Sequence, residues 1–269
     1  TMTMVSFLRD LYVPLPAYAG HGQGRNRINV CYALGSSWKR NSLGGMEMLA
    51  LCIEQNFGIH VDHTIEVSFE SFPRIIDGFG GVEVDVTEDE AEEMNKYIGE
   101  TGMVVEKDAI LVTEGEQTLD GVQAVTYARI RKNVGGDYAR TERQRYVIQK
   151  VVEKVKQTDL VTINEIINEV FSQVSTSFSL GELIKLASGF LQYELGETAG
   201  YPFEHTDSNI EGIGSVVVPL GVKENVEELH AFLYPKDEYE ISQMVIDIAN
   251  EIEYVSGYSR ADYEGDDAN

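Results

Sequence analysis

Arginine is concentrated in one short segment of this acidic chain. The segment RIRKNVGGDYARTERQR, residues 129–145, holds six Lys or Arg residues and only two acidic ones, whereas the 269 residues together carry a formal net charge of −24. Five of the six are arginines, whose planar guanidinium can donate two parallel hydrogen bonds to a phosphate or a carboxylate. A second basic stretch, residues 1–40, has five Lys or Arg residues against the single carboxylate of Asp10. Such islands indicate either a bound anion or a solvated basic surface.

The first arginine pair has a spacing that selects one face of an extended segment. Arg129 and Arg131 are two residues apart, so in extended backbone both side chains leave on the same side. Ala128 and Ile130 would then point the opposite way, towards a core. Continued as a helix, the segment would make the two arginines diverge.

The second arginine group has helical spacing. Arg140 and Gln144 are four apart and would share one helix face. The sequence TERQ, residues 141–144, fits a capping box, and Asp137 is a competing cap one turn earlier. Either start places Arg140 in or beside the first turn, where a cation opposes the helix dipole. A bound anion would explain that placement, because free backbone N–H groups and guanidinium groups then converge on the same oxygens.

Composition excludes several classes of function. The net charge of −24 argues against a general nucleic-acid binder, which needs a broad basic face. No apolar stretch approaches the roughly 18 residues of a membrane helix. Cys31 and Cys52 lack metal-ligand spacing, so we expect two buried thiols, with a single disulfide as the alternative. No phosphate-binding loop, dinucleotide fingerprint or nucleophile elbow is present.

Hydrophobic patterns predict an α/β fold to carry these residues. Strand, helix and strand follow one another between residues 64 and 86, which is typical of a mixed or parallel sheet covered by helices. We expect one domain over residues 1–255 and a disordered acidic tail over 256–269. The predicted strands are 1–7, 64–69, 81–86, 103–113 and 216–218. The predicted helices run from 28 to a stop at Gly58, then 70–79, 87–100, 140–157, 160–172, 180–193 and 236–255, with a loop over 13–26.

Five segments in order give the chain a resemblance to a known family. They are TMVSFLRD, RNRIN, GIHVDHTIEVSFESFPRIIDGFGGVEVDV, GEQTLDGVQAVTYARIRK and GDYARTERQR. Together they resemble the LytR-CpsA-Psr (LCP) proteins of the Gram-positive cell envelope, over residues 1 to about 157. The resemblance implies an α/β/α sandwich with a mixed central sheet and additional C-terminal helices.

The resemblance also implies an activity and a location. LCP proteins transfer a phosphate-linked glycopolymer, such as teichoic acid or capsule, from an undecaprenyl pyrophosphate carrier to a hydroxyl of peptidoglycan. They do so on the extracellular face of the cell membrane, tethered by an N-terminal helix. That helix and the family's first strand would precede residue 1, so we expect the chain to be N-terminally truncated.

The resemblance assigns roles to five residues. The family's catalytic and pyrophosphate-binding positions fall on Arg9, Arg129, Arg131, Arg140 and Gln144. The family's two metal-binding aspartates would lie before this segment, so it implies no metal ligand in this chain. It implies Mg²⁺ for the intact protein, held weakly if at all by this piece.

Two other functions remain open from the sequence. A non-catalytic module that binds a polyprenyl phosphate or pyrophosphate would result if the metal carboxylates were lost. A transcription regulator is disfavoured, because the chain is strongly acidic and shows no helix-turn-helix with a basic recognition helix.

Overall fold

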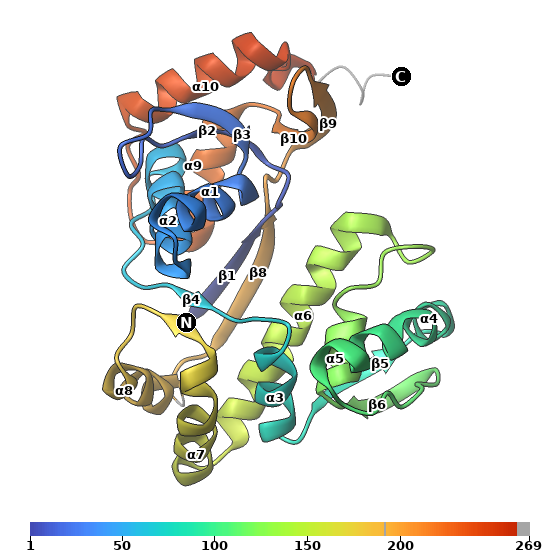
Figure 1. Ribbon diagram of the computed structural model, residues 1–269. Coiled ribbons are helices and arrows are strands. Elements are labelled where there is room, and N and C mark those ends of the chain that lie inside the picture. The colour runs from blue at the N-terminus through green and yellow to red at the C-terminus, as the bar shows by residue number, and fades with distance from the viewer. Residues whose placement is uncertain (191, 263–269) are drawn as a thin grey trace. The chain divides into compact units, whose positions relative to one another are not determined.

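The computed structural model describes residues 1–190 and 192–262, and its chain divides into two compact units (Figure 1). The first unit comprises Thr1–Met2 and Ile65–Glu197, and the second comprises Thr3–Thr64 and Thr198–Asn269. The single domain expected over 1–255 stays a prediction.

The first unit is an antiparallel strand pair packed among helices. Strand β5 (Val82–Val86) pairs with β6 (Gly115–Leu119), with Val82 opposite Leu119. The alternating sequence VEVDV buries its three valines, as period-two patterning requires. Around the pair lie α3 (Ser71–Gly78), α4 (Glu88–Val105), α5 (Gly121–Tyr127) and α6 (Gly136–Gln157), of which α5 packs against both α3 and α4 (Figure 1). The unit also contains β4 (Ile65–Glu66), α7 (Leu160–Val170), η1 (Phe171–Gln173), β7 (Ser175–Thr176) and α8 (Leu180–Phe190).

The second unit joins two antiparallel hairpins through a parallel bridge. Leu11 bridges Val217 in parallel, and its carbonyl accepts a hydrogen bond from the N–H of Ile28. The hairpins are β2 (Tyr12–Leu15) with β3 (Gly24–Arg27), and β9 (His205–Ile210) with β10 (Gly214–Pro219). The helices are α1 (Asn29–Lys39), α2 (Ser42–Phe57), α9 (Val222–Leu233), α10 (Gln243–Ser256) and the short η2 (Arg260–Asp262).

A further strand pair is parallel. Strand β1 (Met2–Phe7) pairs with β8 (Leu195–Tyr201). The N–H of Met2 donates to the carbonyl of Glu194, and the N–H of Leu8 donates to the carbonyl of Tyr201. The residue numbers of the bonded partners increase along both strands, so the two strands run in the same direction. Parallel and antiparallel pairs together confirm the predicted α/β class with mixed strand pairing.

Several predicted elements are confirmed, and others need correction. The strands over 1–7 and 81–86 are present. The helix predicted from 28 to Gly58 is two helices, α1 and α2, separated at Arg40, which has a φ of +58°. The helix predicted over 236–255 begins only at Gln243. The predicted strand 64–69 is confined to Ile65–Glu66, and the predicted loop 13–26 contains parts of β2 and β3. The predicted strand 103–113 is wrong, since its first residues end α4 and the others form no strand.

The two cysteines are unpaired, and part of the C-terminal segment is helical. Cys31 and Cys52 are free, buried thiols, as expected. Of the tail expected over 256–269, Ser256 ends α10 and Arg260–Asp262 forms η2. Residues 263–269 lie outside the described residues.

Candidate functional site

The first arginine pair follows helix α5, where the backbone leaves the helix. The Asp120 side chain caps the start of α5 by accepting from the N–H of Gln123 at 2.9 Å. Beyond the end of α5, Ala128 and Ile130 are buried, while Arg129 and Arg131 are exposed. This alternation confirms that both arginines leave on the solvent side of the segment.

A tight turn over residues 132–135 connects this segment to α6. Asn133 and Gly135 both have positive φ, +57° and +89°, and the N–H of Gly136 closes the turn on the carbonyl of Arg131 at 3.0 Å. Helix α6 therefore begins at Gly136, without a side-chain cap. The predicted capping box in 141–144 is wrong, because the Thr141 hydroxyl lies inside the helix and donates back to the carbonyl of Asp137 at 3.0 Å.

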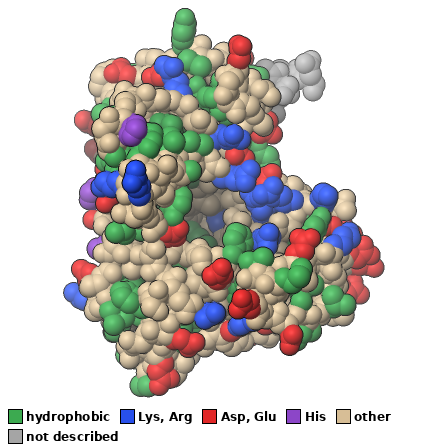
Figure 2. All heavy atoms as spheres, viewed as in Figure 1, with side chains coloured by type: hydrophobic (Ala, Val, Ile, Leu, Met, Phe, Trp, Pro, Cys, Tyr) green, Lys and Arg blue, Asp and Glu red, His purple; other side chains and the backbone are tan. Residues whose placement is uncertain are grey.

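Arg131 and Arg140 meet at one carboxylate oxygen. The Oδ1 atom of Asp137 lies 3.2 Å from Nε of Arg131 and 2.9 Å from Nη1 of Arg140. The Arg140 side chain is only 10% exposed, and its Nε is buried without a hydrogen-bond partner among the described residues. Figure 2 shows Lys and Arg side chains gathered over the N-terminal end of α6 and the turn before it. The arrangement suits an anion with several oxygens, because two guanidinium groups already converge on one acceptor.

Arg129 follows the end of α5, and Gln144 of α6 contacts the backbone next to it. Arg129 donates to the Thr101 hydroxyl at 3.4 Å, and its guanidinium lies 4.9 Å from the centre of the Phe69 ring. The Gln144 amide donates to the carbonyl of Ala128 at 3.3 Å. Gln144 thus ties α6 to the residue that precedes Arg129.

Arg9 belongs to the second unit and lies two residues after the end of β1. Its Nε lies 3.1 Å from Oδ2 of Asp10, and the other carboxylate oxygen lies 3.9 Å from Nη1 of Arg27. Arg27 also donates to the carbonyl of Ile213 at 3.4 Å. The predicted site residues therefore divide between the two units, and their assembly around one ligand stays a prediction.

Sequence reasoning missed Arg27, Arg143 and Glu90. Arg27 stands in the N-terminal basic stretch, but nothing in its spacing linked it to Asp10. Arg143 is buried and its Nε lies 3.3 Å from Oε1 of Glu90 in α4. The one available signal was the sequence Thr87-x-x-Glu90, a capping-box pattern that marks Glu90 as more than a solvated charge.

The carboxylates beside the arginines do not by themselves fit a magnesium site. Magnesium prefers an octahedron of oxygen ligands, whereas Asp10 and Asp137 belong to different units and each already pairs with arginines. Within residues 1–190 and 192–262, no group of three or more His, Cys, Asp or Glu side chains is placed to hold a metal ion. Over the same part of the chain, no helix combines the length and the apolar character of a membrane span.

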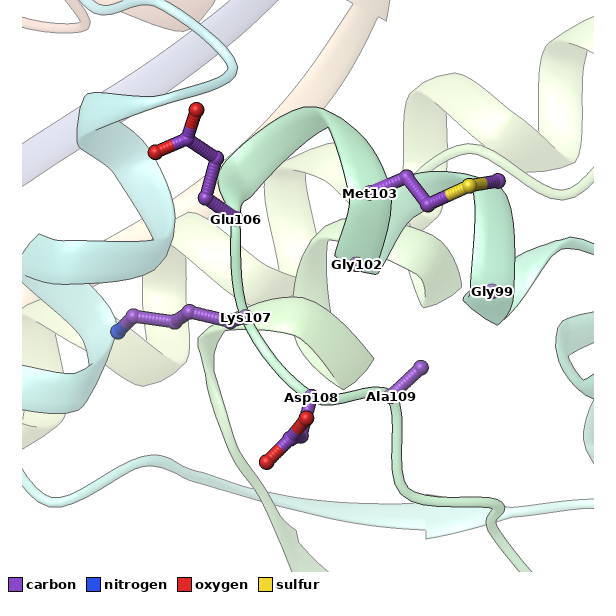
Figure 3. Close-up of a pocket in the computed structure, with 7 residues that line it drawn as sticks. All are labelled: Gly99, Gly102, Met103, Glu106, Lys107, Asp108 and Ala109. Atoms are coloured by element: carbon purple, nitrogen blue, oxygen red, sulfur yellow. The ribbon is translucent and has the colours of Figure 1, made fainter.

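A separate shallow hollow lies at the end of α4, with a volume of about 650 Å³. Figure 3 shows Lys107 pointing to one side of it and Met103 to the other, with Gly102 and Gly99 on the helix below the Met103 side chain. Lys107 is already paired with Asp77. The side chains of this hollow do not converge on one point, so we assign it no ligand.

Comparison with known proteins places the chain in a family. The model of the LytR_cpsA_psr family matches residues 1–228. The chain is 29% identical over 188 residues to TagU of Enterococcus faecalis, a polyisoprenyl-teichoic acid–peptidoglycan teichoic acid transferase, covering 69% of this chain and 52% of that protein. It is also 28% identical to TagV of Bacillus subtilis, a transferase of the same description. That match covers 79% of this chain and 54% of that protein. The chain thus spans about half the length of the curated relatives it matches.

A solved structure supports the same placement at the level of fold. The crystal structure of B. subtilis TagT superposes with a TM-score of 0.62 at 23% identity, covering 86% of this chain and 79% of that one. Fold, sequence motifs and the family model agree, and the chain belongs to the LytR_cpsA_psr family.

Proposed function

We propose that this chain is the catalytic part of a cell-wall glycopolymer phosphotransferase. It moves a phosphate-linked anionic glycopolymer, such as teichoic acid, from an undecaprenyl pyrophosphate carrier to peptidoglycan. Membership of the family and the transferase names of TagU and TagV support this proposal. We place the protein at the extracellular face of a Gram-positive cell membrane, held there by a helix outside the chain.

The observation that carries the proposal is the shared contact of Arg131 and Arg140 with Asp137. The side chains of Asp137 and Arg131 are 54% and 44% exposed, and an ion pair between two exposed groups contributes only about 0.2–1 kcal/mol. A diphosphate, with more charge and more acceptor oxygens, can therefore displace this carboxylate from the two guanidinium groups. Arg129, two residues before Arg131 and on the same solvent-facing side, adds a third guanidinium to the segment.

The chemistry follows from neutralising charge on the diphosphate. A peptidoglycan hydroxyl attacks the phosphorus next to the glycan, and the bond from that phosphorus to the bridging oxygen breaks. The polyprenyl phosphate leaves with the electron pair and takes up the hydroxyl proton. In phosphoryl transfer most catalysis comes from positioning and charge stabilisation. We assign those roles to Arg9, Arg129, Arg131 and Arg140, with Gln144 orienting the segment through the carbonyl of Ala128.

Magnesium would add neutralising charge in the intact protein. Because Asp10 and Asp137 are already paired with arginines, we propose that this chain's own residues hold the ion weakly. No step of the mechanism above depends on it.

The test uses a full-length protein carrying Arg9→Ala or Arg140→Ala, incubated with lipid-linked substrate and magnesium. Released polyprenyl phosphate is measured by mass spectrometry. Each variant should lose at least about 100-fold in rate while its circular dichroism stays unchanged. Lys154→Ala is the matched control, since Lys154 is a cation of α6 that pairs with Glu83.

Two outcomes would contradict the proposal in different ways. Near-normal turnover by both arginine variants would refute the assigned site. Tight binding of the lipid by the wild type without any release of polyprenyl phosphate would instead identify a non-catalytic binding module.

A further inference from the structure

Arg143 lies on the same helix as Arg140 but faces the interior. It is 5% exposed, and its Nε donates to Oε1 of Glu90 at 3.3 Å. A guanidinium this deeply buried is costly unless it is paired and hydrogen-bonded. It is also too enclosed to bind a ligand in solvent, so its influence is exerted on protein groups around it.

Glu90 is itself fixed at the start of α4. Its second carboxylate oxygen accepts from the N–H of Thr87 at 3.2 Å, while the Thr87 hydroxyl accepts from the N–H of Glu90 at 3.3 Å. The guanidinium carbon of Arg143 lies 5.9 Å from the centre of the Tyr127 ring. A capped helix end and an aromatic ring therefore hold the guanidinium in one position.

The other end of that guanidinium reaches the turn before α6. Nη2 of Arg143 donates to the carbonyl of Val134, which lies between the positive-φ residues Asn133 and Gly135. The same turn is closed by the hydrogen bond from Gly136 to Arg131. This turn joins Arg131 to the start of α6. Its position therefore determines the distance between Arg131 and Arg140.

We propose that Arg143, held by Glu90, is a positioning residue that fixes this turn so that Arg131 and Arg140 meet at one anion position. The inference rests on the proposed function, because it assigns Arg143 to the same site. Without the clamp both arginines are still present, but the turn is free to carry Arg131 away from Arg140. Anion affinity would then fall although no group that contacts the anion has been removed.

The test is a double-mutant cycle with inorganic diphosphate as the probe, titrated calorimetrically into the 269-residue chain. Arg143→Gln should weaken binding about tenfold on its own, an effect of the size found for residues of one network. In the presence of Arg131→Gln, the same change should weaken binding by less than about twofold. Full additivity of the two losses would overturn the inference, since Arg143 would then act through something other than the position of Arg131.

Two conservative variants keep the test valid if Arg143→Gln does not fold. Glu90→Gln preserves an acceptor for Thr87 but removes the charge that holds Arg143, and Arg143→Lys keeps the charge but loses the fork that spans Glu90 and Val134. Each should weaken diphosphate binding, whereas Lys154→Met, which breaks another ion pair of α6, should not.

The result also separates this inference from the proposed function. If Arg131→Gln leaves diphosphate binding unchanged, the proposed site is wrong. If Arg131→Gln weakens binding but Glu90→Gln and both Arg143 variants do not, the site stands and the positioning role is refuted.

Discussion

Asn225 is the buried polar residue whose loss we expect to be most damaging to the second unit. It is 1% exposed, at the start of α9. Its side-chain oxygen accepts from the N–H of Phe203 at 2.8 Å and from that of Glu204 at 3.2 Å. Its amide nitrogen donates to the carbonyls of Leu220 at 2.9 Å and Gly221 at 3.0 Å, and to that of Glu204 at 3.1 Å. One side chain therefore holds together two backbone segments of distant sequence.

The expected cost of Asn225→Ala follows from these contacts. The substitution leaves two backbone N–H donors without their acceptor, and a buried unsatisfied polar group costs about 1–3 kcal/mol. The total is about 2–6 kcal/mol in free energy of unfolding, and the carbonyls that lose a donor add to it. For a chain of this size the melting temperature should fall by roughly 5–15 °C.

Urea unfolding followed by circular dichroism measures this loss, with an exposed asparagine as the control. Asn168 in α7 is exposed, and its side chain donates to the carbonyl of Asn164 at 2.7 Å. Asn168→Ala should therefore change the free energy of unfolding by no more than about 0.5 kcal/mol. Equal small losses in the two variants would refute the reasoning, because the buried hydrogen bonds of Asn225 would then contribute nothing net.

Two further predictions concern titration and thiol reactivity. Burial lowers the pKa of His205, so the folded state binds fewer protons than the unfolded state and loses stability as the pH falls below the unfolded value of about 6.5. His205→Gln should reduce the loss of unfolding free energy between about pH 7.5 and 5.5, measured by urea titration at a series of pH values. Cys31 and Cys52 are buried, and contact with Cys31 together with burial raises the pKa of Cys52. A thiol reagent such as dithiobis(nitrobenzoate) should therefore label neither cysteine in the native chain and both in guanidinium chloride. Rapid labelling of the native chain would contradict their burial.

The sequence predicted those elements whose patterns are local. The valines of Val82–Val86 alternate, and this strand buries them as expected. The apolar positions of α2 recur with helical spacing up to Gly58, whose backbone adopts φ of +66° and ends the helix. The exposure of Arg129 and Arg131 followed in the same way from their separation by one residue.

The errors arose where tertiary contacts replaced backbone pairing. In the predicted strand 103–113, the N–H and carbonyl of Val112 both bond the side chain of Asn95, each at 2.9 Å. The Gln123 amide likewise donates to the carbonyl of Ile110 at 3.1 Å. This segment is therefore a loop despite its β-rich composition, because side chains of α4 and α5 bond its backbone. No local sequence pattern reveals those contacts.

The candidate site shows the same limit. Its exposed arginines could be found by composition and spacing, but the clamp between Glu90 and Arg143 joins residues 53 apart in sequence. Arg143 looks like any other basic residue in TERQR. Only the packing of α4 beside α5 and α6 reveals that it is buried.

The division of the chain into two units has a consequence for biosynthesis. The core of the second unit combines Leu11 and Cys52 with Tyr201 and Leu229, so it cannot close until the ribosome has synthesised residues well past 200. The first unit is almost entirely one continuous stretch, Ile65–Glu197, and most of its contacts become available earlier. We therefore expect the nascent chain to fold from its middle outwards, with its N-terminal segment held unfolded or protected by a chaperone until its partners emerge.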